Sequence, residues 1–162
     1  MSMTNIERKG NIDKLGKLPG QIEALVQGLS TEQLTTHYLP NEWTVAQNVH
    51  HLFDSHVNSY IRCKLIATED NPPLKPYDQD LWANMPDAGN ADIAVSLALL
   101  GGLHVRWVQF WNSLQDSDFA RAGVHPDNGA MSLDRILKAY VAHGETHIDQ
   151  IQRTLAAAST DK

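Results

Sequence analysis

Apolar residues recur every three or four positions in four long stretches of this chain, and polar residues fill the positions between them. The stretches cover residues 19–29, 44–67, 91–114 and 132–158. This spacing places the apolar side chains on one face of an α-helix. Because strand-like alternation is nearly absent, the pattern predicts an all-α fold in which four helices enclose one core, a four-helix bundle.

Residues typical of helix ends mark these stretches. Pro19 suits the first turn of a helix, and Thr44 forms a capping box with Gln47. Ser132 is placed to cap the last helix. A further capping box at residues 30–33 predicts one short turn of helix between the first two stretches.

Two segments lack the helical pattern and are predicted to be loops. The long loop between the second and third helices, residues 68–90, holds four of the seven prolines together with Tyr77 and Trp82. Loops of this length are often lids over a functional site. Residues 121–132 form the second predicted loop.

Composition and charge narrow the class of protein. A length of 162 residues fits a single domain, 1–162, and the net charge of −6 disfavours nucleic acid as a partner. No apolar stretch reaches the ~20 residues of a membrane helix, and the N-terminus lacks the apolar core of a signal peptide. We therefore expect a cytoplasmic protein that acts on a small molecule. Cys63, the single cysteine, is expected to pack in the interior.

Two histidines in the last helix suggest metal chemistry. His143 and His147 are four residues apart, so both project from one helix face and can reach one ion. That face is the apolar one, which also carries Ile136 and Ile151. A pair of hydrogen-bonded core histidines is the alternative interpretation.

A third ligand is needed for a catalytic zinc-type site, and the candidates are His50, His51, His56 and His104. His51 belongs to a polar stripe on the second helix that also includes Gln47, Ser55, Asn58 and Arg62. The stripe is either a solvated surface or the wall of a cleft beside the metal.

The other histidines have simpler expected roles. His104 lies on the apolar stripe of the third helix, where it is a fourth ligand, a hydrogen-bond donor to a ligand, or a core residue. His56 is expected to pack on the apolar side of the second helix. His37 and His125 are expected in loops.

The segments EWTVAQNVHHLFDSH and YVAHGETHIDQI resemble the DinB-like superfamily, especially its YfiT-like branch of metal-dependent hydrolases, over about residues 28–155. In that family a tryptophan precedes the ligand of the second helix by eight positions, which here leads from Trp43 to His51. The remaining ligands correspond to His143 and His147. Where the YfiT-like branch tends to carry further histidines, this chain has Glu145, Thr146 and Gln150.

The resemblance implies a four-helix bundle with an open-sided three-histidine site. It implies one divalent metal ion per chain, nickel or zinc, and often a homodimer. The superfamily is also similar to transferases that attach low-molecular-weight thiols such as bacillithiol or mycothiol to electrophiles.

Three function hypotheses follow. A hydrolase would use the metal to lower the pKa of bound water toward ~7, whereas a thiol S-transferase would use the same ion to deprotonate a thiol. A non-catalytic metal-binding module is the third. Candidate helpers for substrate or ligands are Asp54, Asn58, Arg62, Tyr77 and His104.

Overall fold

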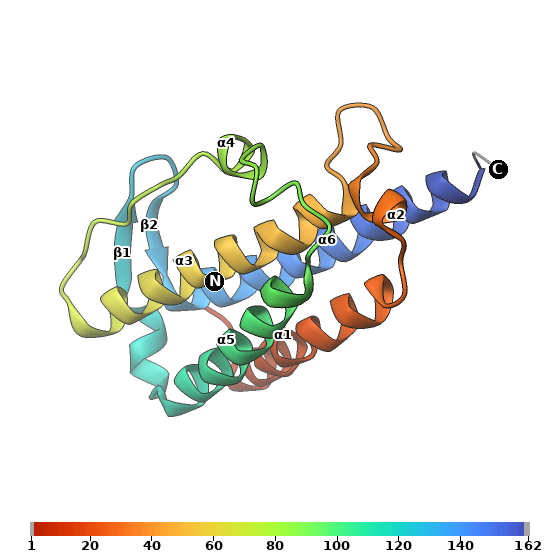
Figure 1. Ribbon diagram of the computed structural model, residues 1–162. Coiled ribbons are helices and arrows are strands. Elements are labelled where there is room, and N and C mark those ends of the chain that lie inside the picture. Colours follow the sequence, from red (N-terminus) through yellow and green to blue (C-terminus); the bar gives the residue numbers. More distant parts are fainter. Residues whose placement is uncertain (1, 161–162) are drawn as a thin grey trace.

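Four long helices form the body of the computed structural model, which describes residues 2–160 (Figure 1). They are α1 (Asn5–Val26), α3 (Val45–Thr68), α5 (Ala94–Ser113) and α6 (Leu133–Thr160). Helices α1 and α3 each pack against both α5 and α6. The predicted four-helix bundle is therefore confirmed.

Shorter elements connect the long helices. They are α2 (Thr31–Thr35), α4 (Gln79–Ala83), the 3-10 helix η1 (Asp116–Ala120), and the antiparallel strands β1 (Ala122–His125) and β2 (Gly129–Ser132). The capping boxes expected at Ser30 and Thr44 are both present. Among the described residues, no helix is both long and apolar enough to cross a membrane.

The predicted start of the first helix is wrong. Helix α1 begins at Asn5, with Thr4 and Glu7 forming a capping box, and Pro19 lies inside the helix. Proline has no N–H, so the carbonyl of Leu15, four residues earlier, has no helical donor. The helix continues past this gap because Leu15 and Ile22 on either side of it are buried in the bundle.

The expected loop at 121–132 is instead a β-hairpin. Gly129 begins β2 with a φ of 65°, a conformation that favours glycine. Strand β1 also holds the segment that follows α3, because the N–H of Val124 donates to the Pro72 carbonyl at 2.9 Å. A Cβ at Gly123 would lie 2.8 Å from that same carbonyl, so the close approach needs glycine.

The apolar interior is divided into two clusters. One contains Ile12, Leu15, Cys63, Ile66, Trp107, Trp111, Leu133 and Leu137, and the other Leu18, Ile22, Val45, Val49, Leu52, Leu100 and Ile151. On α3, α5 and α6 the stretch between the residues of the two clusters carries histidines, namely His56, His104, His143 and His147. A buried polar layer therefore crosses the bundle where the two apolar clusters meet.

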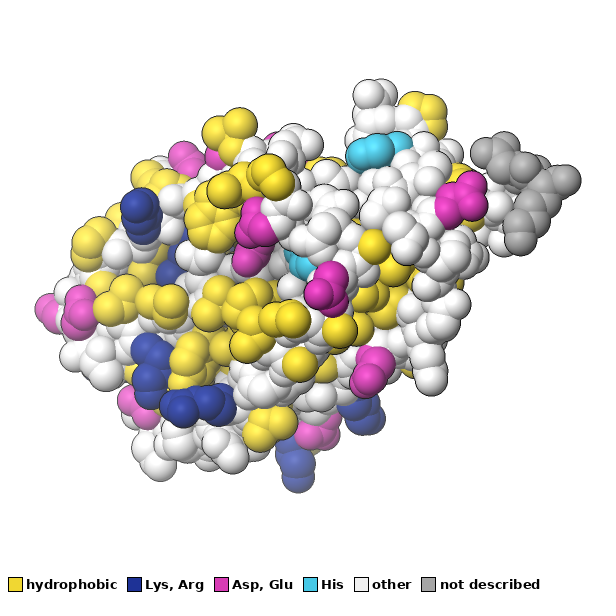
Figure 2. All heavy atoms as spheres, viewed as in Figure 1, with side chains coloured by type: hydrophobic (Ala, Val, Ile, Leu, Met, Phe, Trp, Pro, Cys, Tyr) yellow, Lys and Arg dark blue, Asp and Glu magenta, His cyan; other side chains and the backbone are white. Residues whose placement is uncertain are grey.

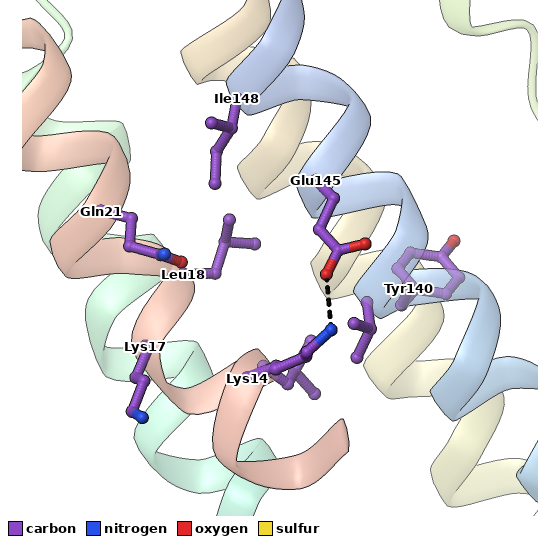
Figure 3. Close-up of a pocket in the computed structure, with 9 residues that line it drawn as sticks. Lys14, Lys17, Leu18, Gln21, Tyr140, Glu145 and Ile148 are labelled. Carbon is purple, nitrogen blue, oxygen red and sulfur yellow. Dashed lines mark hydrogen bonds and ion pairs between the residues drawn. The ribbon is translucent and has the colours of Figure 1, made fainter. Parts of the chain in front are cut away.

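The outer surface has two features that bear on where a site can lie. On the face shown in Figure 2, Lys and Arg side chains gather only in small groups among apolar and acidic side chains. Between α1 and α6 there is a shallow pocket of about 140 Å³, lined by Leu18, Val141 and Ile148 and bridged by a Lys14–Glu145 ion pair at 2.9 Å (Figure 3). Such an exposed pair contributes little to stability.

Candidate metal centre

Three histidines from two helices converge in the polar layer. His51 on α3 and His143 and His147 on α6 offer one nitrogen each, all within 4.8 Å of one another. The Nε2 atom of His143 lies 3.2 Å from that of His51 and 3.1 Å from that of His147. The structure thus brings together the three residues that the sequence predicts as metal ligands.

The spacing of these nitrogens fits a metal ion. Zinc bound tetrahedrally to imidazole at 2.0–2.1 Å places its ligand nitrogens about 3.3 Å apart. The two short Nε2 separations, 3.1 and 3.2 Å, are close to this value. Imidazole nitrogen also binds nickel, copper and iron. The three nitrogens therefore fit a divalent transition metal, but they do not identify which one.

Neighbouring side chains hold two of the three rings. The Trp43 ring packs against His51 with centroids 4.7 Å apart and stacks on His147 at 6.0 Å. His147 Nδ1 lies 2.8 Å from the Asn48 side-chain oxygen, and the Asn48 amide donates to the Thr44 carbonyl. His147 Nδ1 must therefore be the donor, which leaves its Nε2 lone pair facing the other histidines.

Burial keeps these imidazoles uncharged. It lowers the pKa of His51 to about 3, of His143 to about 2 and of His147 to about 4, with mutual repulsion between the rings adding to the effect for the first two. At neutral pH all three are free bases. Neutral imidazole is the form that binds a metal.

Two further histidines extend from the cluster into the core. His56 Nε2 lies 3.1 Å from His143 Nδ1, and His56 Nδ1 lies 2.8 Å from His104 Nε2. The packing expected for His56 is confirmed, because its ring is fully buried against Trp107 and Tyr140, and both of its nitrogens are hydrogen-bonded as well. His104 is separated from the three-histidine cluster by His56, so of its three expected roles the fourth ligand is excluded.

The polar stripe of α3 is buried where it approaches the three-histidine cluster. Gln47, His51 and Ser55 are all at most 5% exposed. The segment 69–93 crosses over this face, and the Gln47 amide donates to the Ala83 carbonyl at 2.8 Å. Tyr77 of the same segment is hydrogen-bonded to Ser55, and burial raises the pKa of its hydroxyl. This part of the stripe is therefore neither a solvated surface nor the wall of an open cleft, because it is buried beneath the segment 69–93.

The remaining candidate helpers are engaged elsewhere. Asp54 lines a separate cavity with His50, and burial raises its pKa. Asn58 donates to the Asp54 carbonyl on its own helix, and Arg62 donates to the Lys75 carbonyl, which ties down the covering segment. These contacts place the three side chains away from the cluster.

A polar cavity of about 330 Å³ opens beside His143 and His147. Its other lining residues are Asn41, Glu42, Trp43, Gln79, Asp80, Thr146 and Gln150. Glu42 Oε2 and Gln150 Oε1 are buried without a hydrogen-bond partner in the described part of the chain. The other Glu42 oxygen accepts from the Arg153 guanidinium at 2.5 Å, so the charge of this carboxylate is offset. The lining therefore offers the Asp80 carboxylate together with the acceptor oxygens of Glu42 and Gln150.

Some of this arrangement has no local signal in the sequence. His56 lies five residues after His51 and so on a different helix face, and its contact with His143 depends on how α3 and α6 pack. Asn48 also has no local pattern that marks it as a partner of His147. The sequence pairs Trp43 with His51 only through the family spacing.

Comparisons with known proteins agree with this geometry. The DinB superfamily profile matches residues 15–151. YfiT of Bacillus subtilis, which is named as a metal-dependent hydrolase, is 43% identical over 141 residues, covering 86% of this chain and 79% of that protein. A relative from Oceanobacillus iheyensis with the same designation is 41% identical over 149 residues, covering 92% of this chain and 86% of its own length.

A solved structure matches the whole arrangement. The structure of Bacillus subtilis YfiT superimposes with a TM-score of 0.94 at 38% identity, covering 98% of this chain and 91% of that one. It is described as having an unusual four-helix bundle topology.

Proposed function

This chain belongs to the DinB superfamily, and from that premise we propose that it is a metal-dependent hydrolase whose divalent ion is held by His51, His143 and His147. The observation that carries the proposal is the convergence of three neutral imidazole nitrogens at metal-ligand spacing beside an open polar cavity. When bound there, a divalent ion supplies a Lewis acid that activates water at neutral pH.

The geometry favours catalysis over a purely structural metal. A structural zinc site is closed by four protein ligands, whereas a catalytic one keeps a position open. His104, the candidate fourth ligand, contacts His56 instead. The cavity of about 330 Å³ borders two of the three proposed ligands and gives a small substrate access to them.

The cavity lining suggests the class of substrate. Glu42 Oε2 and Gln150 Oε1 need hydrogen-bond donors, whereas the charge of Glu42 is offset by its ion pair with Arg153. We infer a small molecule that carries hydrogen-bond donors, such as an amide.

Elemental analysis and a substrate screen test this proposal. Protein purified without an affinity tag should hold close to one nickel, zinc or similar ion per chain. It should hydrolyse small amides or esters that carry hydrogen-bond donors faster than matched substrates in which those donors are methylated, and His51→Ala should abolish the reaction. A folded protein that takes up no divalent ion, or product formation only with an added thiol, would contradict it.

A further inference from the structure

A continuous chain of hydrogen bonds leads from the three-histidine cluster to the backbone of α1. From His143 Nδ1 it passes to His56 Nε2 at 3.1 Å, and from His56 Nδ1 to His104 Nε2 at 2.8 Å. It ends where His104 Nδ1 meets the Leu15 carbonyl oxygen at 2.7 Å. His56 and His104 are at most 1% exposed, so water cannot replace any of these partners.

The hydrogen-bond chain ends at the Leu15 carbonyl, which accepts no hydrogen bond from the backbone N–H four residues later in α1. Leu15 lies four residues before Pro19, and proline has no N–H to donate to it. A buried carbonyl without a partner is costly, and the His104 ring supplies the missing donor. The interior position of Pro19 thereby gives His104 a fixed hydrogen-bond acceptor.

This carbonyl sets the tautomer of every ring in the chain. Because a carbonyl can only accept, His104 must carry its proton on Nδ1, and its Nε2 must accept from His56. His56 then carries its proton on Nδ1 and accepts through Nε2 from His143. His143 consequently holds its proton on Nδ1, which leaves the lone pair of its Nε2 facing His51 and His147.

We propose that His56 and His104 are positioning residues that fix the tautomer and ring orientation of His143 for metal binding. The inference rests on the proposed function only in assigning His143 as a ligand. Since His147 Nε2 also presents a lone pair, the two Nε2 atoms 3.1 Å apart repel one another until a cation lies between them. The series of hydrogen bonds therefore preorganises a site for a cation.

This series of hydrogen bonds does not conduct protons. A proton path needs a group at its far end that can take up or release a proton, and the Leu15 carbonyl can do neither. The two inner histidines thus orient the ligand and make its nitrogen more basic, an effect known for hydrogen-bonded ligands of metal sites.

Paired substitutions test the proposal through metal affinity. Leucine at position 56 or 104 removes both hydrogen bonds, whereas glutamine can accept at its oxygen and donate from its nitrogen. We expect His56→Leu and His104→Leu to weaken zinc binding about 10- to 100-fold, and His56→Gln and His104→Gln to restore most of it. Zinc titration of each metal-free variant against a competing chelator measures these affinities.

His50→Leu is the matched control, because His50 is also buried on α3 but bonds to Ser96 and the Asn90 carbonyl. It should bind zinc as the unsubstituted protein does. If the Leu variants at 56 and 104 bind zinc no more weakly than His50→Leu, the proposal is overturned.

The tautomer can also be read in the unsubstituted, metal-free protein, which removes any dependence on how variants fold. Nitrogen-15 NMR should show the His143 proton on Nδ1, and a proton on Nε2 would overturn the proposal. Both measurements are independent of hydrolysis. A protein that hydrolyses no substrate but shows the expected zinc affinities and the Nδ1 proton on His143 would contradict the proposed function. It would still support the positioning role of His56 and His104.

Discussion

Two adjacent histidines on α3 have different environments. His51 faces His143, while His50 points about 100° away around the helix and bonds to Ser96 and the Asn90 carbonyl. We therefore expect His51→Ala to weaken metal binding by orders of magnitude and His50→Ala to leave most affinity intact. Chelator competition under one set of conditions gives the order of the two affinities. The reverse order would show that the eight-residue spacing from Trp43 does not carry over.

At this scale, the sequence identifies residues whose position follows from helix periodicity. His143 and His147 share a face because they are four residues apart, and His51 follows from the family spacing. His56 and His104 could be placed in the interior but not joined, because 48 residues separate them and their contact depends on the packing of α3 against α5. Asp54 and Arg62 were expected near the site only because polar residues on one helix face suggested a continuous wall.

Helix α1 offers a test in which metal affinity falls while stability does not. Pro19→Ala gives the helix an N–H that competes with His104 for the Leu15 carbonyl. A carbonyl has two lone pairs, so we expect only about a two- to tenfold loss of zinc affinity. The free energy of unfolding should be unchanged or higher, since proline disfavours a helix interior by about 3 kcal/mol relative to alanine.

Gly20→Ala is the control for this change. Gly20 is exposed with open space around its Cα, and alanine there should stabilise α1 by up to about 1 kcal/mol while leaving the Leu15 carbonyl to His104. Equal zinc affinity for the two variants would show that the missing N–H at position 19 has no role. Chemical unfolding gives the stabilities and chelator competition the affinities.

The sequence predicts three of the four long helices well, and each failure has a physical reason. Proline is common in the first turn of a helix, so Pro19 suggested a start, although the capping box of Thr4 and Glu7 already marked the true one. The β-hairpin was missed because each strand has four residues, too few to show alternation. The register of the hairpin depends partly on the hydrogen bond from Val124 of β1 to the Pro72 carbonyl, which is distant in the sequence.

The stability of the whole molecule should depend on pH through its buried histidines. Burial lowers the folded-state pKa of five of them, namely His51, His56, His104, His143 and His147. Below about 6.5 the unfolded chain binds protons that the folded chain does not, so stability falls with decreasing pH. Each such histidine can contribute up to about 1.4 kcal/mol per pH unit until its folded pKa, near 4 for His104, is reached.

Urea unfolding of the metal-free protein between pH 7 and pH 5 measures this dependence. The unfolding midpoint should fall steadily over that range, and His104→Gln should reduce the slope because one titrating group is lost. A midpoint that does not change from pH 7 to pH 5 would show that the five rings are not held neutral in the folded protein.

The hydrogen-bond chain to Leu15 takes one group from each long helix: Leu15 from α1, His56 from α3, His104 from α5 and His143 from α6. These groups are far apart in the sequence, so no partly folded chain that lacks one docked helix has the complete series. We therefore expect tight metal capture to be the last event of folding. A chain in which only α3 and α6 have docked would already hold the three ligands, but about 10- to 100-fold more weakly. The rise to full affinity would therefore report the moment at which the fourth helix docks.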